Sequence, residues 1–250
     1  MTSLAMRDRP LPAPPPLAAD AALFADLDGT LAPIEARPDQ VRPTTERSAL
    51  LARLGQVLRG RLAVLSGRGL TDLDHLLGRE VKAVAAIHGL VRRGADGQVH
   101  EIAPHKDLPK ALNALEDFAS AHTGLLVESK SHAVALHYRA APELEAEVRA
   151  FVVPLAERLG LVLQPGRKVA ELRTPGPDKG EALAAFMDEP PFAGAVPVFI
   201  GDDATDEHAF AAAGRLGGYG VIVGDRRPTQ ARYGLANVED AFAWLGTVGA

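Results

Sequence analysis

Short runs of apolar residues alternate with longer amphipathic stretches over most of this chain, and this alternation constrains the fold more than any other feature. Continuous apolar runs of this length are typical of strands that are buried on both faces of a sheet. The strand candidates lie at 21–25, 61–65, 81–87, 196–200 and 219–223, and the helix candidates lie at 44–58, 70–77, 178–187 and 207–213. The pattern predicts an α/β fold with a Rossmann-like, doubly wound, mainly parallel sheet.

The middle of the chain has a different pattern. Long helix candidates at 107–122 and 142–160 are each followed by a pair of adjacent strand candidates, and the two pairs are joined by short turns around Lys130 and Pro165. Strands that follow one another so closely pair antiparallel, because parallel pairing needs a longer crossover. We therefore expect an α+β domain inserted into the parallel core, with the core at 21–103 and 175–250 and the insert, a cap for substrate specificity, at 104–174.

The first twenty residues contain five of the 19 prolines in the chain. Proline has no N–H to donate, so this composition favours neither a helix nor an interior strand. We expect residues 1–20 to form a disordered leader.

Composition and charge exclude several classes of protein. The chain has 250 residues and a formal net charge of −5, with no polybasic run that could neutralise nucleic acid or an anionic membrane. Cysteine is absent, so disulfides, thiolate metal sites and a cysteine nucleophile are excluded. No stretch approaches the length of a membrane span. We expect a cytoplasmic monomer whose partner is a small molecule, with neither nucleic acid nor membrane involved.

Three polar clusters follow predicted parallel strands directly. In an open parallel sheet, ligands bind outside the carboxyl ends of the strands, so side chains at these positions converge. The clusters are Asp26-Leu27-Asp28-Gly29-Thr30, Ser66-Gly67-Arg68 and Gly201-Asp202-Asp203-Ala204-Thr205-Asp206. Each string alone is typical of a turn or a helix cap, and the three together indicate a site.

The carboxylates in these clusters would repel one another strongly if they were buried together without compensation. A divalent cation resolves the conflict, and an all-oxygen ligand set suits Mg²⁺, which commonly shares its coordination sphere with a substrate phosphate. Ser66 and Thr30 offer hydroxyl donors, Gly29 lets backbone N–H groups face an anion, and Lys179 offers a fixed positive charge. The combination predicts a phosphoryl-transfer site with a carboxylate nucleophile.

The order Asp26-x-Asp28-Gly29-Thr30, then Ser66, Lys179 and Gly201-Asp202-Asp203-x-x-Asp206 resembles the four motifs of haloacid dehalogenase superfamily phosphatases. We expect Asp26, Asp28, Asp202, Asp203 and Asp206 to converge on one cation. The strings Asp28 to Ile34, Ser66-Gly67-Arg68, Glu128-Ser-Lys130, His137-Tyr138-Arg139 and Lys168-Val-Ala-Glu171-Leu-Arg173 are similar to those of trehalose-6-phosphate phosphatases. The resemblance covers the whole core and implies a HAD-like hydrolase with an inserted cap that acts in trehalose biosynthesis.

The resemblance also implies roles for individual residues. Asp26 would be the nucleophile that forms an aspartyl-phosphate, and Asp28 the acid that protonates the leaving sugar and then activates water. Ser66 and Lys179 would bind phosphoryl oxygens. Mg²⁺ would be held by Asp26, the backbone carbonyl of Asp28, Asp202 and Asp203. The predicted substrate-binding residues are Gly29, Thr30, Gly67, Arg68, His88, Glu128, Lys130, Arg139, Arg167, Lys168 and Glu171.

Two alternatives stay open at the level of the residues. The same architecture could serve another sugar phosphate, such as sucrose 6-phosphate or mannosyl-3-phosphoglycerate. A non-catalytic module that binds a sugar phosphate is the other alternative, although a pure binder would gain nothing from the repulsion between Asp26 and Asp28.

Overall fold

The structure is a computed structural model, and it describes residues 11–78 and 80–249. The described chain divides into two compact units. The core unit contains the described residues up to His100 together with those from Pro177 onward, and the inserted unit is Glu101–Gly176. The insert thus begins three residues before the expected position 104 and ends two residues after the expected position 174.

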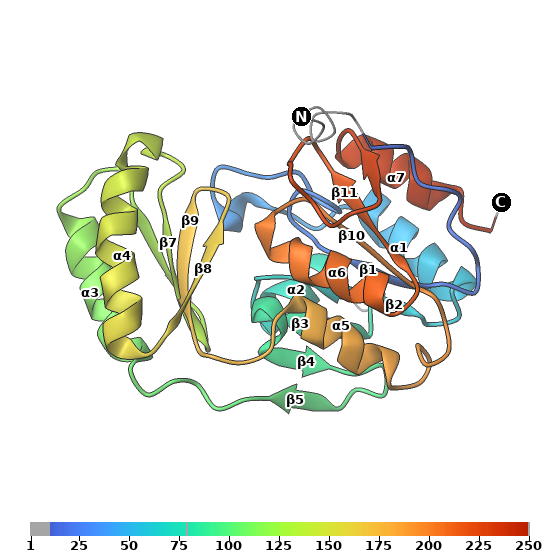
Figure 1. The fold of residues 1–250 in the computed structure, drawn as a ribbon, viewed down its shortest axis with the longest axis horizontal. Coiled ribbons are helices and arrows are strands. Elements are labelled where there is room, and N and C mark those ends of the chain that lie inside the picture. Colours follow the sequence, from blue (N-terminus) through green and yellow to red (C-terminus); the bar gives the residue numbers. More distant parts are fainter. Residues whose placement is uncertain (1–10, 79, 250) are drawn as a thin grey trace, which may run out of the picture. The chain divides into compact units, whose positions relative to one another are not determined.

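The core unit is built on one eight-stranded sheet, whose strands from β12 to β3 are parallel and whose β4 is antiparallel to β3 (Figure 1). The strands in sheet order are β12 (Tyr233–Leu235), β11 (Tyr219–Val223), β10 (Pro197–Gly201), β1 (Ala22–Ala25), β2 (Leu62–Leu65), β3 (Ala83–Ala86), β4 (Val91–Arg93) and β5 (Val99–Glu101). The expectation of a doubly wound, mainly parallel sheet is confirmed. The short strands β4, β5 and β12 lie outside the strand candidates named from the sequence.

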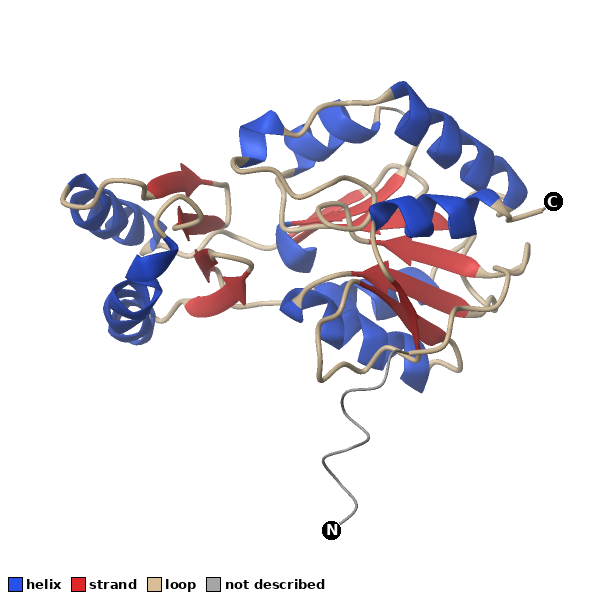
Figure 2. Cartoon of the chain, turned by 90° about the horizontal axis from the view of Figure 1, so that it is seen from above, coloured by secondary structure: helices blue, strands red, loops and turns tan. Residues whose placement is uncertain are grey.

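Helices lie on both faces of the core sheet (Figure 2). The core helices are α1 (Thr45–Val57), α2 (Leu70–Leu77), α5 (Lys179–Met187), α6 (Glu207–Arg215) and α7 (Val238–Gly246), with short 3₁₀ turns η1 (Pro38–Gln40), η2 (Ile87–Gly89) and η4 (Ala204–Asp206). Side chains of α5 and α6 pack with one set of alternate strand residues, including Phe24 and Phe199, into a single apolar cluster. Helix α1 packs against α2 and α7.

The helix that begins at Lys179 has a strong local start signal. Its N-cap residue, Asp178, accepts hydrogen bonds from the backbone N–H groups of Gly180 and Glu181, and Glu181 bonds back to the Asp178 backbone. This reciprocal capping box satisfies N–H groups that the first turn of a helix otherwise leaves without partners. The cap therefore holds Lys179 at the first helical position of α5.

The inserted unit contains a four-stranded antiparallel sheet with two helices on one face (Figures 1 and 2). Its elements are α3 (Leu108–Ser120), β6 (Leu126–Ser129), β7 (Ala133–His137), η3 (Pro142–Leu144), α4 (Glu145–Leu159), β8 (Val162–Gly166) and β9 (Val169–Arg173). Leu136 and Leu172 point to the face that packs with apolar residues of both helices. The insert thus has an apolar core of its own, as the sequence pattern predicts.

Residues 11–20 lie against the core, so the expectation of disorder is wrong for this part of the leader. The backbone N–H of Gly234 donates to the Pro12 carbonyl at 3.0 Å, and the indole Nε1 of Trp244 donates to the Pro15 carbonyl at 2.8 Å. Leu17 is buried. Proline lacks a donor, but its carbonyl still accepts, and the elements around the leader supply the donors. The remainder of the predicted leader, residues 1–10, lies outside the described residues.

Within the described ranges, no helix is both long and apolar enough to cross a membrane.

Candidate active site

Three adjacent strands bring the polar clusters together. Strand β1 pairs with β10 on one edge and with β2 on the other, and all three are parallel, so their carboxyl ends lie side by side. Asp26 follows β1, Ser66 follows β2 and Asp202 follows β10. The predicted convergence at the carboxyl edge of the sheet is what the topology produces.

An ion-paired triad lies at this edge. The Lys179 Nζ is 2.8 Å from Oδ1 of Asp26 and 2.7 Å from Oδ1 of Asp206. All three residues are buried, and the Lys179 side chain is only 2% exposed. An ammonium group has three N–H donors, and two of them are used by these carboxylates. With both carboxylates ionised, the triad would carry a net negative charge in a buried place.

The pKa values of the triad follow from its burial. Burial raises the pKa of Asp26 well above its usual range and opposes the lowering effect of Lys179, while the neighbouring carboxylates add to the increase. Burial likewise raises the pKa of Asp206. Burial alone would lower the pKa of Lys179, but attraction to Asp206 and Asp26 outweighs it and raises that pKa. A further positive charge would favour the ionised carboxylates.

Oxygen atoms of Asp26, Asp202 and Asp206 lie within 4.8 Å of one another, so these three residues could hold a metal ion. An all-carboxylate donor set fits a hard divalent cation, and the excess negative charge of the triad needs one. Asp203, which the resemblance implies as a ligand, instead accepts hydrogen bonds from the backbone N–H and the hydroxyl of Thr205 through Oδ1. In this geometry Asp206, rather than Asp203, belongs to the carboxylate cluster.

Asp206 also organises the loop after β10. Its Oδ2 accepts from the backbone N–H groups of Asp202 and Asp203, at 2.8 and 3.1 Å, while its Oδ1 accepts from Lys179. A Cβ added at Gly201 would lie 2.4 Å from the Asp206 carboxyl carbon. A glycine at this position is therefore what allows the Asp206 carboxylate to reach beneath the loop.

The turn after β1 depends on Gly29. Its φ of +90° lies in the region that side chains disfavour, and a Cβ at this position would lie 2.2 Å from Oδ2 of Asp202. The backbone N–H of Gly29 donates to the Ala32 carbonyl at 2.7 Å, which closes the turn. Among the described residues, the buried hydroxyl of the next residue, Thr30, has no hydrogen-bond partner. That hydroxyl is a donor whose bond a bound anion would complete.

Ser66 is buried at the end of β2, and its Oγ accepts from the backbone N–H of Arg68 at 3.2 Å. Its own O–H remains available to donate. Gly67 makes room for a neighbouring side chain, because a Cβ there would lie 2.6 Å from Nε2 of His88. The His88 backbone is left-handed, with a φ of 59°, and its N–H donates to the Ser66 carbonyl. His88 is thereby fixed beside the second motif.

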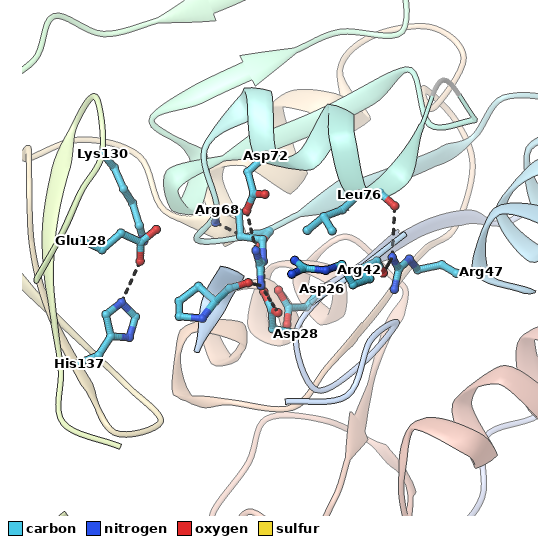
Figure 3. A network of polar contacts seen from close by, with 12 residues as sticks. Asp26, Asp28, Arg42, Arg47, Arg68, Asp72, Leu76, Glu128, Lys130 and His137 are labelled. Atoms are coloured by element: carbon cyan, nitrogen blue, oxygen red, sulfur yellow. Dashed lines mark hydrogen bonds and ion pairs between the residues drawn. The ribbon is translucent and has the colours of Figure 1, made fainter. Parts of the chain in front are cut away.

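The Arg68 guanidinium pairs with Asp28, as Figure 3 shows. Nε donates to Oδ2 at 2.7 Å and Nη2 donates to Oδ1 at 2.8 Å, so both carboxylate oxygens are engaged. Burial opposes the charged form of Arg68, but the hydrogen bonds that Arg68 donates to Asp28 and Asp72, and the attraction to their charges, outweigh it and raise the pKa of Arg68. The arginine thus contacts the predicted acid–base residue directly.

The insert gathers three predicted residues on one face of its sheet. Glu128 and Glu171 both lie opposite Ala135, and therefore on one face, and this is the face away from the two helices. Lys130 donates to Glu171 at 2.5 Å, and His137 and Glu128 are joined at 2.8 Å (Figure 3). The small side chain of Ala135 leaves space between the two carboxylates.

The other predicted residues of the insert have contacts near or at its surface. The Arg139 Nη2 donates to the backbone carbonyl of Arg167, whose side chain is exposed. Lys168 forms an exposed ion pair with Glu145 at 2.5 Å. These contacts are ordinary surface interactions.

Sequence reasoning gave no role to two residues that the structure places in these networks. Asp72 pairs with Arg68 at 2.5 Å, and the spacing of four residues is one that favours such a pair. His137 bonds to Glu128 across two strands. The four-residue spacing of Arg68 and Asp72 could have predicted their ion pair from the sequence. The contact between His137 and Glu128 could not be predicted in this way, because it depends on the register of the two strands.

The sheet order and the inserted unit define the fold class: an α/β core of the HAD type with an inserted α+β unit. Among solved structures, a Bacteroides thetaiotaomicron phosphatase of the haloalkanoate (HAD) enzyme superfamily matches 91% of this chain and 96% of that one, with a TM-score of 0.62 and 18% identity. The C-terminal domain of Candida albicans trehalose-6-phosphate phosphatase matches 92% of both chains, with a TM-score of 0.80 and 22% identity.

The sequence comparisons are more specific. A sequence model of the trehalose-phosphatase family matches residues 24–239. The chain is 40% identical over 242 residues to the trehalose-6-phosphate phosphatase of Escherichia coli, covering 94% of this chain and 89% of that protein. It is 38% identical to a probable trehalose-phosphate phosphatase of Sinorhizobium fredii, covering 92% and 86%. The chain belongs to the trehalose-phosphatase family.

Proposed function

We propose that the protein hydrolyses trehalose 6-phosphate to trehalose and inorganic phosphate with Mg²⁺ as its cofactor, through an aspartyl-phosphate on Asp26. The observation that carries the proposal is the buried Asp26 at the end of β1, 2.8 Å from Lys179, in a chain of the trehalose-phosphatase family. The substrate is supported by the relatives in Escherichia coli, a trehalose-6-phosphate phosphatase, and in Sinorhizobium fredii, a probable trehalose-phosphate phosphatase.

Asp26 acts first, as the nucleophile. One of its oxygens attacks phosphorus and forms an O–P bond, while the bond from phosphorus to the sugar oxygen breaks. Asp28 gives its proton to that sugar oxygen, so trehalose leaves as a neutral alcohol. Lys179 and the Ser66 hydroxyl hold the phosphoryl oxygens and stabilise the charge that they carry.

Water completes the reaction. Asp28, now ionised, takes a proton from the water molecule as its oxygen attacks phosphorus, and the bond between phosphorus and Asp26 breaks. Phosphate is released, and both aspartates return to their starting forms. Lys179 remains paired with Asp206 throughout, which keeps its ammonium group at the edge of β1.

The metal site fits this role. Asp26, Asp202 and Asp206 are the carboxylates that would hold Mg²⁺. The Asp28 carbonyl is a further oxygen ligand that the resemblance implies. When bound, the ion supplies positive charge that draws electron density from the phosphoryl group and favours the ionised form of the buried carboxylates.

In this proposal, residues of the insert recognise the sugar part of the substrate. A disaccharide has many hydroxyl groups and no charge beyond its phosphate, so charged or bidentate polar side chains are suited to recognise it. Glu128, Lys130 and Glu171 share one face of the insert sheet and supply such groups. We assign these three residues of the insert to sugar recognition.

The test is a phosphate-release assay with Mg²⁺ across trehalose 6-phosphate, sucrose 6-phosphate, mannosyl-3-phosphoglycerate and an aryl phosphate, repeated in EDTA. We expect trehalose 6-phosphate to have the highest kcat/KM and EDTA to abolish turnover. Asp26→Asn should remove activity on every substrate while the circular dichroism spectrum stays unchanged. Near-wild-type turnover by this variant contradicts the nucleophile, and preference for another sugar contradicts the substrate.

In the same assay, Glu128→Gln distinguishes recognition of the sugar by the insert from the phosphoryl transfer carried out by the core. Loss of at least 10-fold in kcat/KM for trehalose 6-phosphate with less than twofold change for the aryl phosphate is the expected result, because only the sugar substrate offers hydroxyl groups. Glu143→Gln, an exposed position of the same unit, is the matched control and should change neither. Equal losses on both substrates would remove Glu128 from sugar recognition.

A further inference from the structure

Arg68 has its donors committed within the protein. The guanidinium has five N–H groups, and four of them are used by three partners. Two bond to the oxygens of Asp28, one to Oδ2 of Asp72 at 2.5 Å and one to the Pro38 carbonyl at 3.1 Å. This arrangement argues against the sequence-based assignment of Arg68 to substrate binding, because only one donor is left for a ligand.

The fork between Arg68 and Asp28 is well suited to fix a carboxylate. Two parallel N–H···O bonds set the plane of the carboxylate as well as its position, which a single contact does not. The Arg68 side chain is 9% exposed and the Asp28 side chain 35% exposed, so the arginine is the buried, fixed partner and the aspartate is the accessible one. Without the fork, the Asp28 carboxylate would have other rotamers open to it.

Arg68 is itself held from several elements. Its backbone N–H bonds to the Ser66 hydroxyl, and its carbonyl accepts from the N–H of Ile87. Asp72 comes from the first turn of α2 and the Pro38 carbonyl from η1. The head of the side chain is therefore tied to α2 and to η1, and its backbone to the end of β2.

A forked carboxylate keeps reactive capacity. Each carboxylate oxygen has two lone pairs, and the fork uses one on each, so Asp28 can still accept a proton on a remaining site. The contact therefore restricts where the Asp28 oxygens lie without closing them to proton transfer.

We propose that Arg68 is a positioning residue that holds the Asp28 carboxylate in place for proton transfer, and that Asp72 in turn holds Arg68. The inference rests on the proposed function, in which Asp28 is the acid and base. A misplacement of a catalytic group by about 1 Å lowers a rate by about 100-fold, so loss of the fork should affect the steps that use Asp28 and spare the step that does not.

Kinetics with p-nitrophenyl phosphate as the substrate distinguish formation of the aspartyl-phosphate from its hydrolysis. The leaving group of this substrate departs without a proton, so transfer of the phosphoryl group to Asp26 does not require the acid, whereas hydrolysis of the aspartyl-phosphate still requires the base. In Arg68→Gln we expect the first turnover, followed by stopped flow, to keep its rate constant within threefold. The steady-state kcat should fall about 10- to 100-fold, with KM changed less than threefold. Asp72→Asn should slow the same phase by a smaller factor.

Other roles for Arg68 give other patterns. Contact with the phosphoryl group would slow the first turnover and raise KM, and contact with the sugar would leave both phases with p-nitrophenyl phosphate intact. Either result overturns the proposal. Arg68→Lys should recover only part of the steady-state rate, because lysine cannot form the fork, and it serves as the second variant if Arg68→Gln does not fold. Full recovery by lysine also contradicts the fork.

Arg93→Gln is the matched control. Arg93 forms a similar bidentate ion pair with Asp74, the other aspartate of α2. Its Nη1 is 2.9 Å from Oδ2 and its Nη2 is 2.8 Å from Oδ1. Its removal should leave both phases within twofold of the wild type. Asp28→Asn is measured first: a wild-type steady-state rate in this variant would refute the proposed role of Asp28 itself, which is distinct from a failure of Arg68 to position it.

Discussion

Replacement of Lys179 by methionine tests directly whether this lysine compensates the charge of the two buried carboxylates. Methionine keeps an unbranched side chain of similar length and removes the only cation that the described structure places between Asp26 and Asp206. Both carboxylates are buried, so the change leaves uncompensated charge where solvent can screen it little. Breaking a buried ion pair in this way costs about 3–5 kcal/mol.

Urea unfolding measures the cost, and Trp244 reports it. This residue is the one tryptophan of the chain, it is buried in α7 of the core unit, and its fluorescence follows that unit. With a urea dependence of about 3 kcal/mol/M, the expected loss moves the midpoint down by about 1–1.7 M. EDTA is present in all samples, because a bound cation would replace part of the missing charge.

A second substitution and a control sharpen the test. Adding Asp206→Asn to Lys179→Met should restore about 1–3 kcal/mol, because one of the two unpaired charges is removed while the amide oxygen can still accept from the loop. Lys110→Met removes a lysine that is 72% exposed and paired with Asp107, and it should shift the midpoint by less than about 0.3 M. Equal shifts for the Lys179 and Lys110 variants would refute the reasoning.

Two further predictions concern separate parts of the chain. Gly29→Ala places a Cβ where Oδ2 of Asp202 lies, so the Asp202 carboxylate must turn away. The Mg²⁺ concentration needed for half-maximal phosphate release should therefore rise about 10- to 100-fold. An unchanged activation constant would contradict the contact. The Phe118 carbonyl and Glu147 raise the pKa of His122 from its usual 6.5, so this contribution to stability is complete below pH 6.5 and is lost as pH rises through the higher folded value. The thermal midpoint of His122→Ala should therefore depend less on pH between 6 and 8 than that of the wild type, and parallel curves would exclude the effect.

The fold was largely predictable because local patterns and topology agree. Apolar runs such as 21–25 and 196–200 give the parallel strands, and the adjacent strand pairs give the antiparallel insert. Strand β12 was not predicted, because its three residues, Tyr-Gly-Leu at 233–235, are half-buried and form no continuous apolar run. The order of residues 11–20 escaped it as well, because it depends on donors that lie more than two hundred residues away in the chain.

The site was predictable as a set of residues and less so as a set of contacts. Strand ends indicate that Asp26, Ser66 and Asp202 converge, because parallel strands share an edge. Sequence alone does not indicate which oxygen bonds to which donor, so the choice between Asp203 and Asp206 for the carboxylate cluster needed coordinates. The same holds for the pairing of Arg68 with Asp28.

The pairing of β1 with β10 has a consequence for synthesis of the chain. Strand β1 is made early and finds β2 soon after, but its other edge must wait until the whole insert has been made and β10 follows. The insert has its own apolar core and local strand pairs, so it can fold in that interval. Lys179, Asp202 and Asp206 all emerge after it. The polar edge of the sheet is thus completed only after the insert has been made. A chain that ends before residue 179 retains Asp26 without the lysine that pairs with it.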